Sequence, residues 1–168
     1  MQNDQYTRVT PILDYDHPLI DKLVLQRSWE KLPEFERIGA VYNFVKDEIL
    51  FGYNASDNLP ASQVLADGYG QCNTKSTLFM ALLRRLGIAC RFHGFTIYNS
   101  LQKGAVPAWL FFMAPSKIIH SWVEVRYKDN WVALEGLILD ADYLQVIQRR
   151  FCHSGDAFSG YGVATKNL

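Results

Sequence analysis

A glycine-containing turn followed directly by a long helix is the feature that most constrains how this chain folds. Residues 67–70 read Asp-Gly-Tyr-Gly, which is typical of a turn. From Cys72 to about Leu86 apolar residues recur at helical spacing, and Gly87 stands where glycine commonly caps the end of a helix. The pattern predicts one buried stripe along this helix, formed by Leu78, Ala81, Leu82 and Leu86. A cysteine is therefore expected at the first turn of a core helix.

The order of the other patterns predicts an α+β fold. Helices are expected at about 19–32, 33–50, 61–66 and 138–151, with a loop at 52–59. Strands are expected at 88–98, 118–127 and 131–137, and the segment 99–116 is expected to be a long irregular loop. Helices first and strands later, with hairpin-like connections, are typical of an α+β fold with an antiparallel sheet. We expect one domain over residues 1–168, with its core at about 33–151 and weak order from residue 154 onward.

Composition and charge argue against several classes of protein. The chain has 168 residues, and its 17 basic and 17 acidic residues give a formal net charge of zero. A neutral chain offers no electrostatic argument for binding nucleic acid or an anionic membrane. Its three cysteines are too few for a disulfide scaffold, and no apolar run approaches the ~20 residues that span a bilayer. Residues 1–8 are polar and show no signal-peptide pattern, so a cytoplasmic protein is expected.

Cys72 is the candidate nucleophile. A thiol attacks carbon as the thiolate, and the free N–H groups and macrodipole of a helix N-terminus favour that anion. The position of Cys72 therefore predicts a thiol pKa below its usual range. Gly70 allows close backbone approach beside the sulfur, and the Cys72 N–H is a candidate oxyanion donor. The alternative is a structural, buried cysteine; a phosphate-binding loop is excluded because Thr74 stands where that motif requires glycine.

A predicted strand supplies the candidate base. Within the segment 118–127, His120, Trp122 and Glu124 are spaced two apart, so a strand puts their side chains on one face. A histidine placed beside a cysteine takes its proton and activates it. The alternative reading of His120 is a core histidine whose hydrogen bonds are satisfied.

The tight turn at residues 128–129 selects a candidate carboxylate to orient that histidine. A two-residue turn there sets Glu135 opposite Trp122 on the neighbouring strand, on the face of His120 and diagonal to it. Diagonal neighbours lie roughly 7–8 Å apart at the backbone, which long side chains can bridge. A shift of one residue in the pairing would move Glu135 to the other face. The rival carboxylates are Glu124 and Asp140.

These pieces, in this order, resemble the transglutaminase-like superfamily. Its pattern is Gly-x-Cys opening a long helix, then a strand with His-x-Trp, then a strand that ends in an acid. The matching segments are Gly70-Gln71-Cys72, residues 81–88, His120-Ser121-Trp122-Val123-Glu124-Val125 and Trp131-Val132-Ala133-Leu134-Glu135. The resemblance runs from about Tyr42 to Asp140 and implies a papain-like α+β fold, with N-terminal helices and a nucleophile helix packed on an antiparallel sheet.

The same resemblance implies roles for individual residues. Cys72 corresponds to the nucleophile, His120 to the base, and Glu135 to the usual aspartate; glutamate there is a departure that adds a methylene to the reach of the carboxylate. The superfamily also tends to complete its oxyanion hole with a polar or aromatic side chain. The candidates for the oxyanion and substrate site are Tyr53, Asn54, Tyr69 and Trp122.

No metal or organic cofactor is expected. Cysteine and histidine residues that could suggest zinc occur at Cys90, His93, His120, Cys152 and His153. However, Cys90 and His93 fall on opposite faces of a predicted strand, and a closed zinc site needs four converging ligands. No oxygen-rich loop suggests calcium.

The sequence thus predicts a cysteine-dependent acyl-transfer enzyme that forms a thioester on Cys72. Hydrolysis of an amide in a peptide, protein or small molecule is favoured, and transfer to an amine is the alternative. A non-catalytic binding module and a thiol redox protein are kept as further alternatives. Aromatic residues in the segment 99–116 predict an apolar wall of the substrate cleft: Trp109, Phe111 and Phe112. Neither the substrate nor the oligomeric state follows from the sequence.

Overall fold

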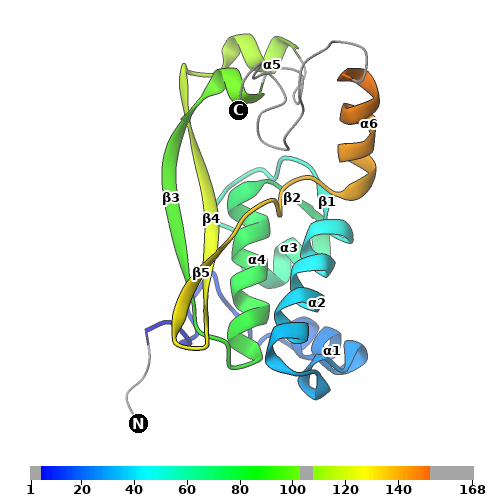
Figure 1. Cartoon of the computed structure of the whole chain (residues 1–168), viewed down its shortest axis with the longest axis vertical. Coiled ribbons are helices and arrows are strands. Elements are labelled where there is room, and N and C mark those ends of the chain that lie inside the picture. The colour runs from blue at the N-terminus through cyan, green and yellow to red at the C-terminus, as the bar shows by residue number, and fades with distance from the viewer. Residues whose placement is uncertain (1–4, 103–107, 152–168) are drawn as a thin grey trace. The chain divides into compact units, whose positions relative to one another are not determined.

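A computed structural model describes residues 5–102 and 108–151 of the chain (Figure 1). The chain forms two compact units. Unit 1 comprises Met1–His93 and Ser121–Asp140, and unit 2 comprises Gly94–His120 and Ala141–Leu168. The chain therefore passes from one unit to the other within two long strands and again after Asp140.

Unit 1 opens with short helices whose ends are set by local chemistry. Helix α1 (Pro18–Arg27) begins where proline is tolerated, and the His17 imidazole accepts the Leu19 N–H at 3.2 Å. The predicted helix at 19–32 is wrong from residue 28 onward. Ser28 adopts a left-handed conformation (φ 53°) and ends α1, and the 3₁₀ turn η1 (Trp29–Lys31) follows. Helices α2 (Glu34–Asp47) and α3 (Ala61–Asp67) lie where the sequence predicts them.

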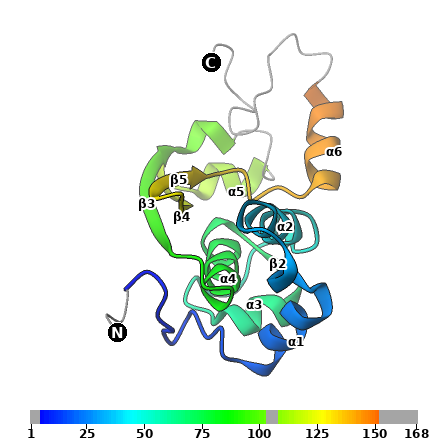
Figure 2. The ribbon, with the colours of Figure 1, turned by 60° about the horizontal axis from the view of Figure 1, so that its bottom comes forward.

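Helix α4 (Cys72–Arg85) is the central element of unit 1, and it begins at the predicted cysteine. The predicted stripe is buried, but so are the other faces, because every residue from Thr74 to Arg84 is buried. Helices α2 and α3 pack against it (Figure 2). Val123 and Val125 of the sheet belong to the same hydrophobic core. A helix covered on all sides holds its first turn firmly in place.

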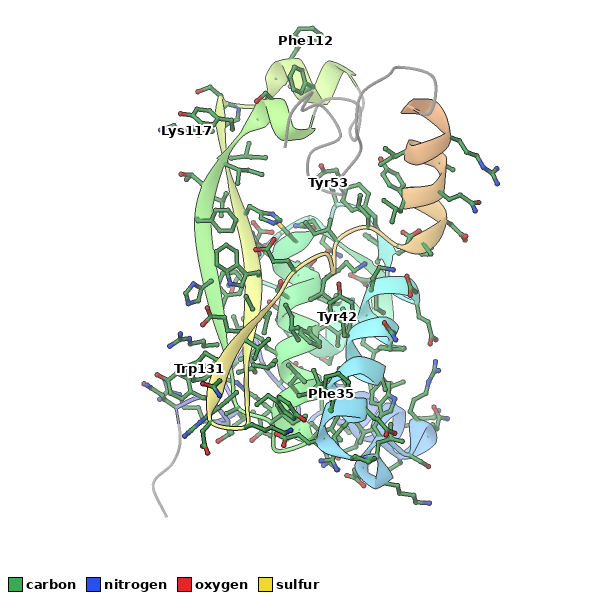
Figure 3. All side chains as sticks on the ribbon, viewed as in Figure 1. Phe35, Tyr42, Tyr53, Phe112, Lys117 and Trp131 are labelled. Carbon is green, nitrogen blue, oxygen red and sulfur yellow. The ribbon has the colours of Figure 1, made fainter. Side chains whose placement is uncertain are left out.

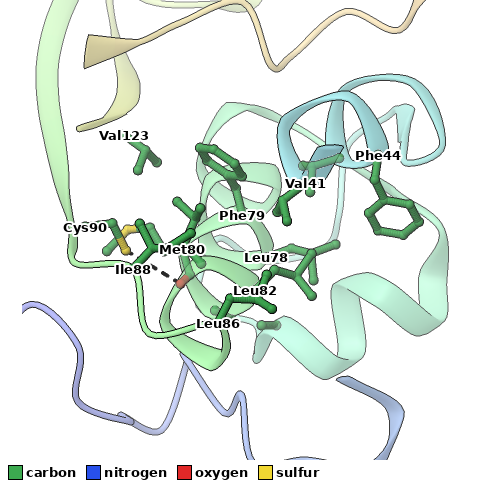
Figure 4. Close-up of a cluster of buried hydrophobic side chains, with 14 of the residues drawn as sticks. Val41, Phe44, Leu78, Phe79, Met80, Leu82, Leu86, Ile88, Cys90 and Val123 are labelled. Atoms are coloured by element: carbon green, nitrogen blue, oxygen red, sulfur yellow. Dashed lines mark hydrogen bonds between the residues drawn. The ribbon is translucent and has the colours of Figure 1, made fainter. Parts of the chain in front are cut away.

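The core around α4 is built from large aliphatic and aromatic side chains (Figure 4). Leu78, Phe79 and Leu82 are fully buried on α4, and Val41 of α2 meets them. Burying a side chain of this size stabilises the fold by roughly 1.5–3 kcal/mol. Cys90 joins the core, and its thiol donates to the Met80 carbonyl at 3.6 Å.

Three strands form a sheet in the order β3-β4-β5. Strands β4 and β5 form an antiparallel hairpin. They are β3 (Cys90–Tyr98), β4 (Lys117–Tyr127) and β5 (Asn130–Leu134). The predicted register is confirmed from Tyr127 opposite Asn130 to Val123 opposite Leu134. The predicted strand at 131–137 is wrong at its end, because β5 stops at Leu134 and Glu135 follows the paired residues. The turn residues Lys128 and Asp129 both have positive φ (47° and 64°), as a tight two-residue hairpin requires.

Two very short strands were not predicted. Strand β1 (Leu50–Phe51) pairs in parallel with β2 (Tyr69–Gly70), just before α4. Each has two residues, too few to show any alternation in the sequence.

Unit 2 corrects the prediction of an irregular loop at 99–116. Its described part contains the 3₁₀ turn η2 (Asn99–Gln102) and helix α5 (Ala108–Met113); residues 103–107 lie outside the described residues. Asn99 closes the segment, because its side-chain amide donates to the Phe111 carbonyl and its N–H to the Ser116 carbonyl, both at 2.9 Å. Phe112 on α5 is 83% exposed (Figure 3).

The terminal helix α6 (Ala141–Phe151) also belongs to unit 2 and begins three residues later than the prediction of 138. The predicted weakly ordered tail lies outside the described residues. Within residues 5–102 and 108–151, none of the helices has the length and apolar character needed to cross a membrane.

Candidate active site

Cys72 is the first residue of α4, and its side chain is partly buried in unit 1. The thiol donates to the side-chain oxygen of Asn73, with 3.7 Å between Sγ and Oδ1. The Ser121 hydroxyl of β4 donates to the same Oδ1 at 2.8 Å. The candidate nucleophile is therefore joined through one amide oxygen to the strand that carries the His-x-Trp motif.

The turn before Cys72 is fixed by the β1–β2 pair. The Gly52 N–H donates to the Gly70 carbonyl at 3.1 Å. A Cβ on Gly70 would lie only 2.6 Å from the Thr74 hydroxyl oxygen. Glycine at position 70 thus leaves room for side chains of the first turn of α4, and the predicted close backbone approach beside the sulfur stays a prediction.

Asn54 and Gln71 hold the N-terminus of α4 in place. Gln71 caps the helix: its N–H donates to the Thr74 hydroxyl at 3.0 Å, and its side-chain oxygen accepts the Asn54 N–H at 2.8 Å. The Asn54 side chain accepts from the Thr74 hydroxyl at 2.6 Å and donates to the Tyr69 carbonyl at 3.2 Å. Asn54 therefore helps to build the turn that presents Cys72, and the oxyanion role considered for it stays a prediction.

The electrostatics of the thiol differ from the expectation. Burial raises the pKa of the Cys72 thiol, and this effect exceeds the hydrogen bonds from Ser121 and from the Asn73 and Cys72 main chain, which lower it. The charge of Asp57 raises the pKa further. The free N–H groups of the helix act in the predicted direction, but burial outweighs them. A thiol in this setting needs a base to ionise near neutral pH.

The aromatic candidates lie on the exposed side of the turn. Tyr53 is 54% exposed and its ring contacts Phe51 edge-on at 5.5 Å (Figure 3). Tyr69 is 40% exposed and packs against Gly52. Both side chains are accessible to a bound molecule.

The candidate base lies on β4. His120 is buried and belongs to unit 2, where its ring meets the Phe95 ring edge-on at 5.2 Å. The next residue in the chain, Ser121, belongs to unit 1 and bonds to the first turn of α4 through Asn73. The pairing of His120 with Cys72 stays a prediction.

Three carboxylates were considered as the third member, and their surroundings in unit 1 differ. Glu135 directly follows β5 and is exposed; among the described residues of unit 1 its carboxylate forms no hydrogen bond or ion pair. Glu124 pairs with Arg91 at 2.5 Å and with His93 at 3.3 Å. Asp140 is buried and accepts the Phe51 N–H at 2.8 Å. Glu124 and Asp140 thus have structural partners.

The remaining sequence candidate, Trp122, stacks on His93 with ring centroids 5.4 Å apart. The Arg91 guanidinium lies 4.3 Å from the centre of the Trp131 ring. Trp122 is therefore part of a side-chain layer on the sheet, and any part it takes in substrate binding stays a prediction.

Comparison with known proteins decides the family. The family model described as the transglutaminase-like superfamily matches residues 24–136. The chain belongs to the transglutaminase-like superfamily. The match contains Cys72, His120 and Glu135, the residues on which the resemblance was based. No curated protein matches the chain.

A solved structure supports the fold of this superfamily. It is described as a "Putative Cysteine Protease from Cytophaga hutchinsonii" and is similar over 81% of this chain, with a TM-score of 0.54 and 17% sequence identity. The chain spans 47% of the length of that protein. The likeness confirms the predicted α+β fold.

The described part of this transglutaminase-like chain holds no group of three or more metal-binding side chains. Cys90 is buried and burial raises its pKa to about 11, while His93 pairs with Glu124. Cys152 and His153, the other residues weighed for zinc, lie outside the described residues.

Sequence reasoning missed several residues that the structure brings to the site. Asn73 and Ser121 contact the thiol region, and Tyr42 and Lys75 hold the segment that follows β5. Ser121 lies inside the recognised His-x-Trp motif, so its position was a usable signal. The partners of Tyr42 and Lys75 are main-chain carbonyls distant in sequence, which no local pattern reveals.

Proposed function

We propose that this chain is a cysteine-dependent acyl-transfer enzyme that acts on amide bonds. The observation that carries the proposal is the placement of Cys72 as the first residue of a buried helix, after a turn in which a Cβ at position 70 would lie 2.6 Å from the Thr74 hydroxyl oxygen. Membership of the transglutaminase-like superfamily supports the same chemistry. The proposed roles are Cys72 as nucleophile, His120 as base and Glu135 as the carboxylate that orients the histidine.

The proposed reaction has two halves. His120 takes the thiol proton, and the Cys72 sulfur attacks the amide carbonyl carbon, while the helix N-terminus stabilises the charge that develops on oxygen. The carbon–nitrogen bond then breaks, and the leaving amine receives the proton from His120. A thioester on Cys72 remains. Water, deprotonated by His120, releases the acyl group as an acid and regenerates the thiol.

The requirement for a base follows from the thiol itself. Burial raises the pKa of Cys72, so the thiolate does not form readily alone. A neighbouring histidine that becomes positively charged stabilises the thiolate as an ion pair. This favours a Cys–His mechanism over an isolated reactive thiol.

Hydrolysis of a peptide or other amide is the favoured outcome, and transfer to an amine is the second candidate. The two share every step up to the thioester. Among the described residues, the exposed rings of Tyr53 and Tyr69 beside the turn favour a substrate with an apolar or aromatic portion.

The test traps the thioester. The protein is mixed with p-nitrophenyl butyrate, and the acyl adduct is located by mass spectrometry. We expect the adduct on Cys72, its loss in Cys72→Ala, and its retention in the matched control Cys90→Ala. A chase with water and with glycinamide then separates hydrolysis from amine transfer by the product formed.

The role of His120 is tested in the same assay. His120→Gln is expected to slow acylation by roughly 10²-fold or more, whereas His93→Gln, on the neighbouring strand, should leave it within a few-fold. An absent adduct, or one that forms equally fast in His120→Gln, would contradict the proposal. The first result would instead favour a binding module that retains the fold.

A further inference from the structure

Resting on the proposed function, we propose that Ser121 is a positioning residue whose hydroxyl turns from the Asn73 amide oxygen to the Cys72 sulfur when the thiol ionises. Nothing in the superfamily pattern assigns a role to this position between the histidine and the tryptophan. The hydroxyl would serve as a built-in donor for the thiolate in a place where water has little access.

The geometry shows two donors that share one acceptor. Asn73 Oδ1 accepts the Ser121 hydroxyl at 2.8 Å and the Cys72 thiol at 3.7 Å. Ser121 is only 4% exposed, so its hydroxyl has little water to bond to. A hydroxyl hydrogen rotates freely about its C–O bond, so the same oxygen can donate to either neighbour.

Ser121 is a polar residue on a face of β4 that is apolar and buried further along the strand. Val123 and Val125, two and four residues further along the strand, are fully buried in the core. The burial pattern of β4 puts Ser121 on that same face, and the neighbouring His120 is buried as well, so two consecutive residues are buried at this point of the strand. A hydroxyl on an apolar face costs free energy unless it is hydrogen-bonded, and its partner is found at the first turn of α4.

Ionisation changes the Cys72 sulfur from a hydrogen-bond donor to a hydrogen-bond acceptor. As a thiol, Cys72 donates to Asn73 Oδ1; as a thiolate, it has no hydrogen to donate and accepts instead. The amide oxygen is then an unfavourable neighbour, since both atoms carry negative charge. A hydrogen bond from Ser121 lowers the pKa of Cys72, and bonds to charged acceptors are roughly twice as strong as neutral ones.

Among the described residues, the charged group that acts on the sulfur is Asp57, an anion that cannot supply this donor. The charge of Asp57, whose carboxylate is held by the Gln71 side chain at 2.6 Å, raises the pKa of Cys72. Of the helix residues, Asn73 directs its side-chain oxygen at the sulfur, whereas the main chain of Asn73 and Cys72 lowers the pKa of the thiol. His120 is the proposed proton acceptor and becomes a cation, but Ser121 acts without taking a proton.

The experiment measures thiol ionisation without requiring turnover. Alkylation of Cys72 by iodoacetamide is followed by mass spectrometry from pH 5 to 10, and the rate gives the midpoint of ionisation. Ser121→Ala is expected to raise this midpoint by about 1–2 pH units, the equivalent of a lost hydrogen bond to a charged group. Ser62→Ala is the matched control. It also removes a buried serine hydroxyl, but that hydroxyl donates to the Asp14 carboxylate.

Three further variants allow the inference to be tested even if Ser121→Ala folds poorly. Ser121→Thr retains a hydroxyl and Ser121→Val has a similar shape without one, so only the valine variant should show the raised midpoint. Asn73→Ala removes the competing acceptor and should leave the midpoint unchanged or lower it. If Asn73→Ala raised the midpoint of Cys72 ionisation as much as Ser121→Ala, the hydrogen bond between Ser121 and Asn73 would serve only to hold the helix in place. That result would overturn the inference.

The outcomes separate this inference from the proposed function. If Ser121→Ala and Ser121→Val titrate like the wild type while the thioester still forms, Ser121 has no such role and the proposed function stands. If the Ser121 variants shift the midpoint but no acyl adduct forms on the wild-type protein, the positioning role stands and the proposed function fails.

Discussion

The Tyr42 hydroxyl donates a hydrogen bond of 2.5 Å to the main-chain carbonyl of Glu135. This contact joins helix α2 to the residue that directly follows β5 (Figure 3). The Tyr42 ring meets the Phe79 ring edge-on at 6.1 Å, so its direction is set by the core. Burial, together with the charge of Asp47, raises the pKa of Tyr42 and keeps the hydroxyl protonated as a donor. The next residue, Gly136, has φ 82° and lies against the same hydroxyl.

Tyr42→Phe is expected to weaken both stability and turnover. The ring stays on Phe79, but the carbonyl of Glu135 loses its partner, which costs about 0.5–1.5 kcal/mol of unfolding free energy. Because Glu135 is proposed to orient His120, kcat should fall several-fold while KM stays within two-fold. Urea denaturation and steady-state kinetics measure the two effects. Tyr127→Phe, on the hairpin, serves as the control; an unchanged kcat in Tyr42→Phe with lowered stability would assign the bond to the fold alone.

Neutralising each of the three carboxylates in turn is expected to give different changes in kcat and in stability. Glu135→Gln should lower kcat by roughly 10²–10⁴-fold if it orients His120, with little change in stability because its side chain is exposed. Glu124→Gln breaks the pairs with Arg91 and His93 on the sheet and should leave kcat within a few-fold. The acylation assay and thermal unfolding measure both quantities.

Asp140→Asn is the third comparison. Asp140 is buried and accepts the Phe51 N–H, so its substitution should chiefly lower the free energy of unfolding, by about 1–3 kcal/mol. A loss of kcat in Asp140→Asn that exceeds the loss in Glu135→Gln, in protein that is still folded, would transfer the orienting role to Asp140.

Gly70→Ala is expected to disrupt the presentation of Cys72. The added methyl would lie 2.6 Å from the Thr74 hydroxyl oxygen, which also accepts the Gln71 N–H and donates to Asn54. Overpacking of this kind costs about 1–3 kcal/mol, and the shift of the helix N-terminus should reduce acylation of Cys72 more than ten-fold. Differential scanning calorimetry and the acylation rate measure the outcome.

A matched glycine provides the control for this substitution. A Cβ on Gly39, inside helix α2, would meet no atom within 4 Å. Gly39→Ala should therefore leave acylation unchanged and raise stability by up to about 1 kcal/mol, because alanine is the better helix former. Equal effects of the two substitutions on acylation would contradict the steric argument at Gly70.

The start of α4 and the register of the hairpin could be predicted because both depend on short segments. A turn with two glycines followed by helical spacing places Cys72, and a two-residue turn allows only one pairing of its flanking strands. The break at Ser28 could not be predicted, because serine gives no local sign of a left-handed conformation. Strands β1 and β2 depend on each other across a loop and carry no pattern of their own.

The electrostatics of the site could be predicted only in part. The helix N-terminus lowers the pKa of Cys72 as expected, but the depth of burial is a property of the folded unit and outweighs it. The same limit applies to the carboxylates. The sequence favoured Glu135 and kept Glu124 and Asp140 as rivals, and only the fold shows that the two rivals have structural partners.

The buried Lys75 is expected to make the free energy of unfolding depend on pH. Its side chain is fully buried, and its ammonium donates to the carbonyls of Lys46 at 3.0 Å and Ile138 at 3.1 Å. Burial lowers the pKa of Lys75 from 10.5 to about 8, against the charges of Asp140 and Asp47, which raise it. A neutral amine still has two hydrogens and can retain both bonds.

Because the folded state releases this proton at lower pH than the unfolded state, the unfolded state binds more protons between pH 8 and 10.5. The contribution of Lys75 to the unfolding free energy should therefore rise over this range, by at most about 3 kcal/mol, and fall again as the pH is lowered through 8. Urea denaturation of the wild type and of Lys75→Met from pH 7 to 11 measures it, since other titrating groups cancel in the difference. Lys22→Met, an exposed lysine, should give a curve parallel to the wild type. A constant difference between the wild type and Lys75→Met would show that Lys75 keeps its ordinary protonation in the fold.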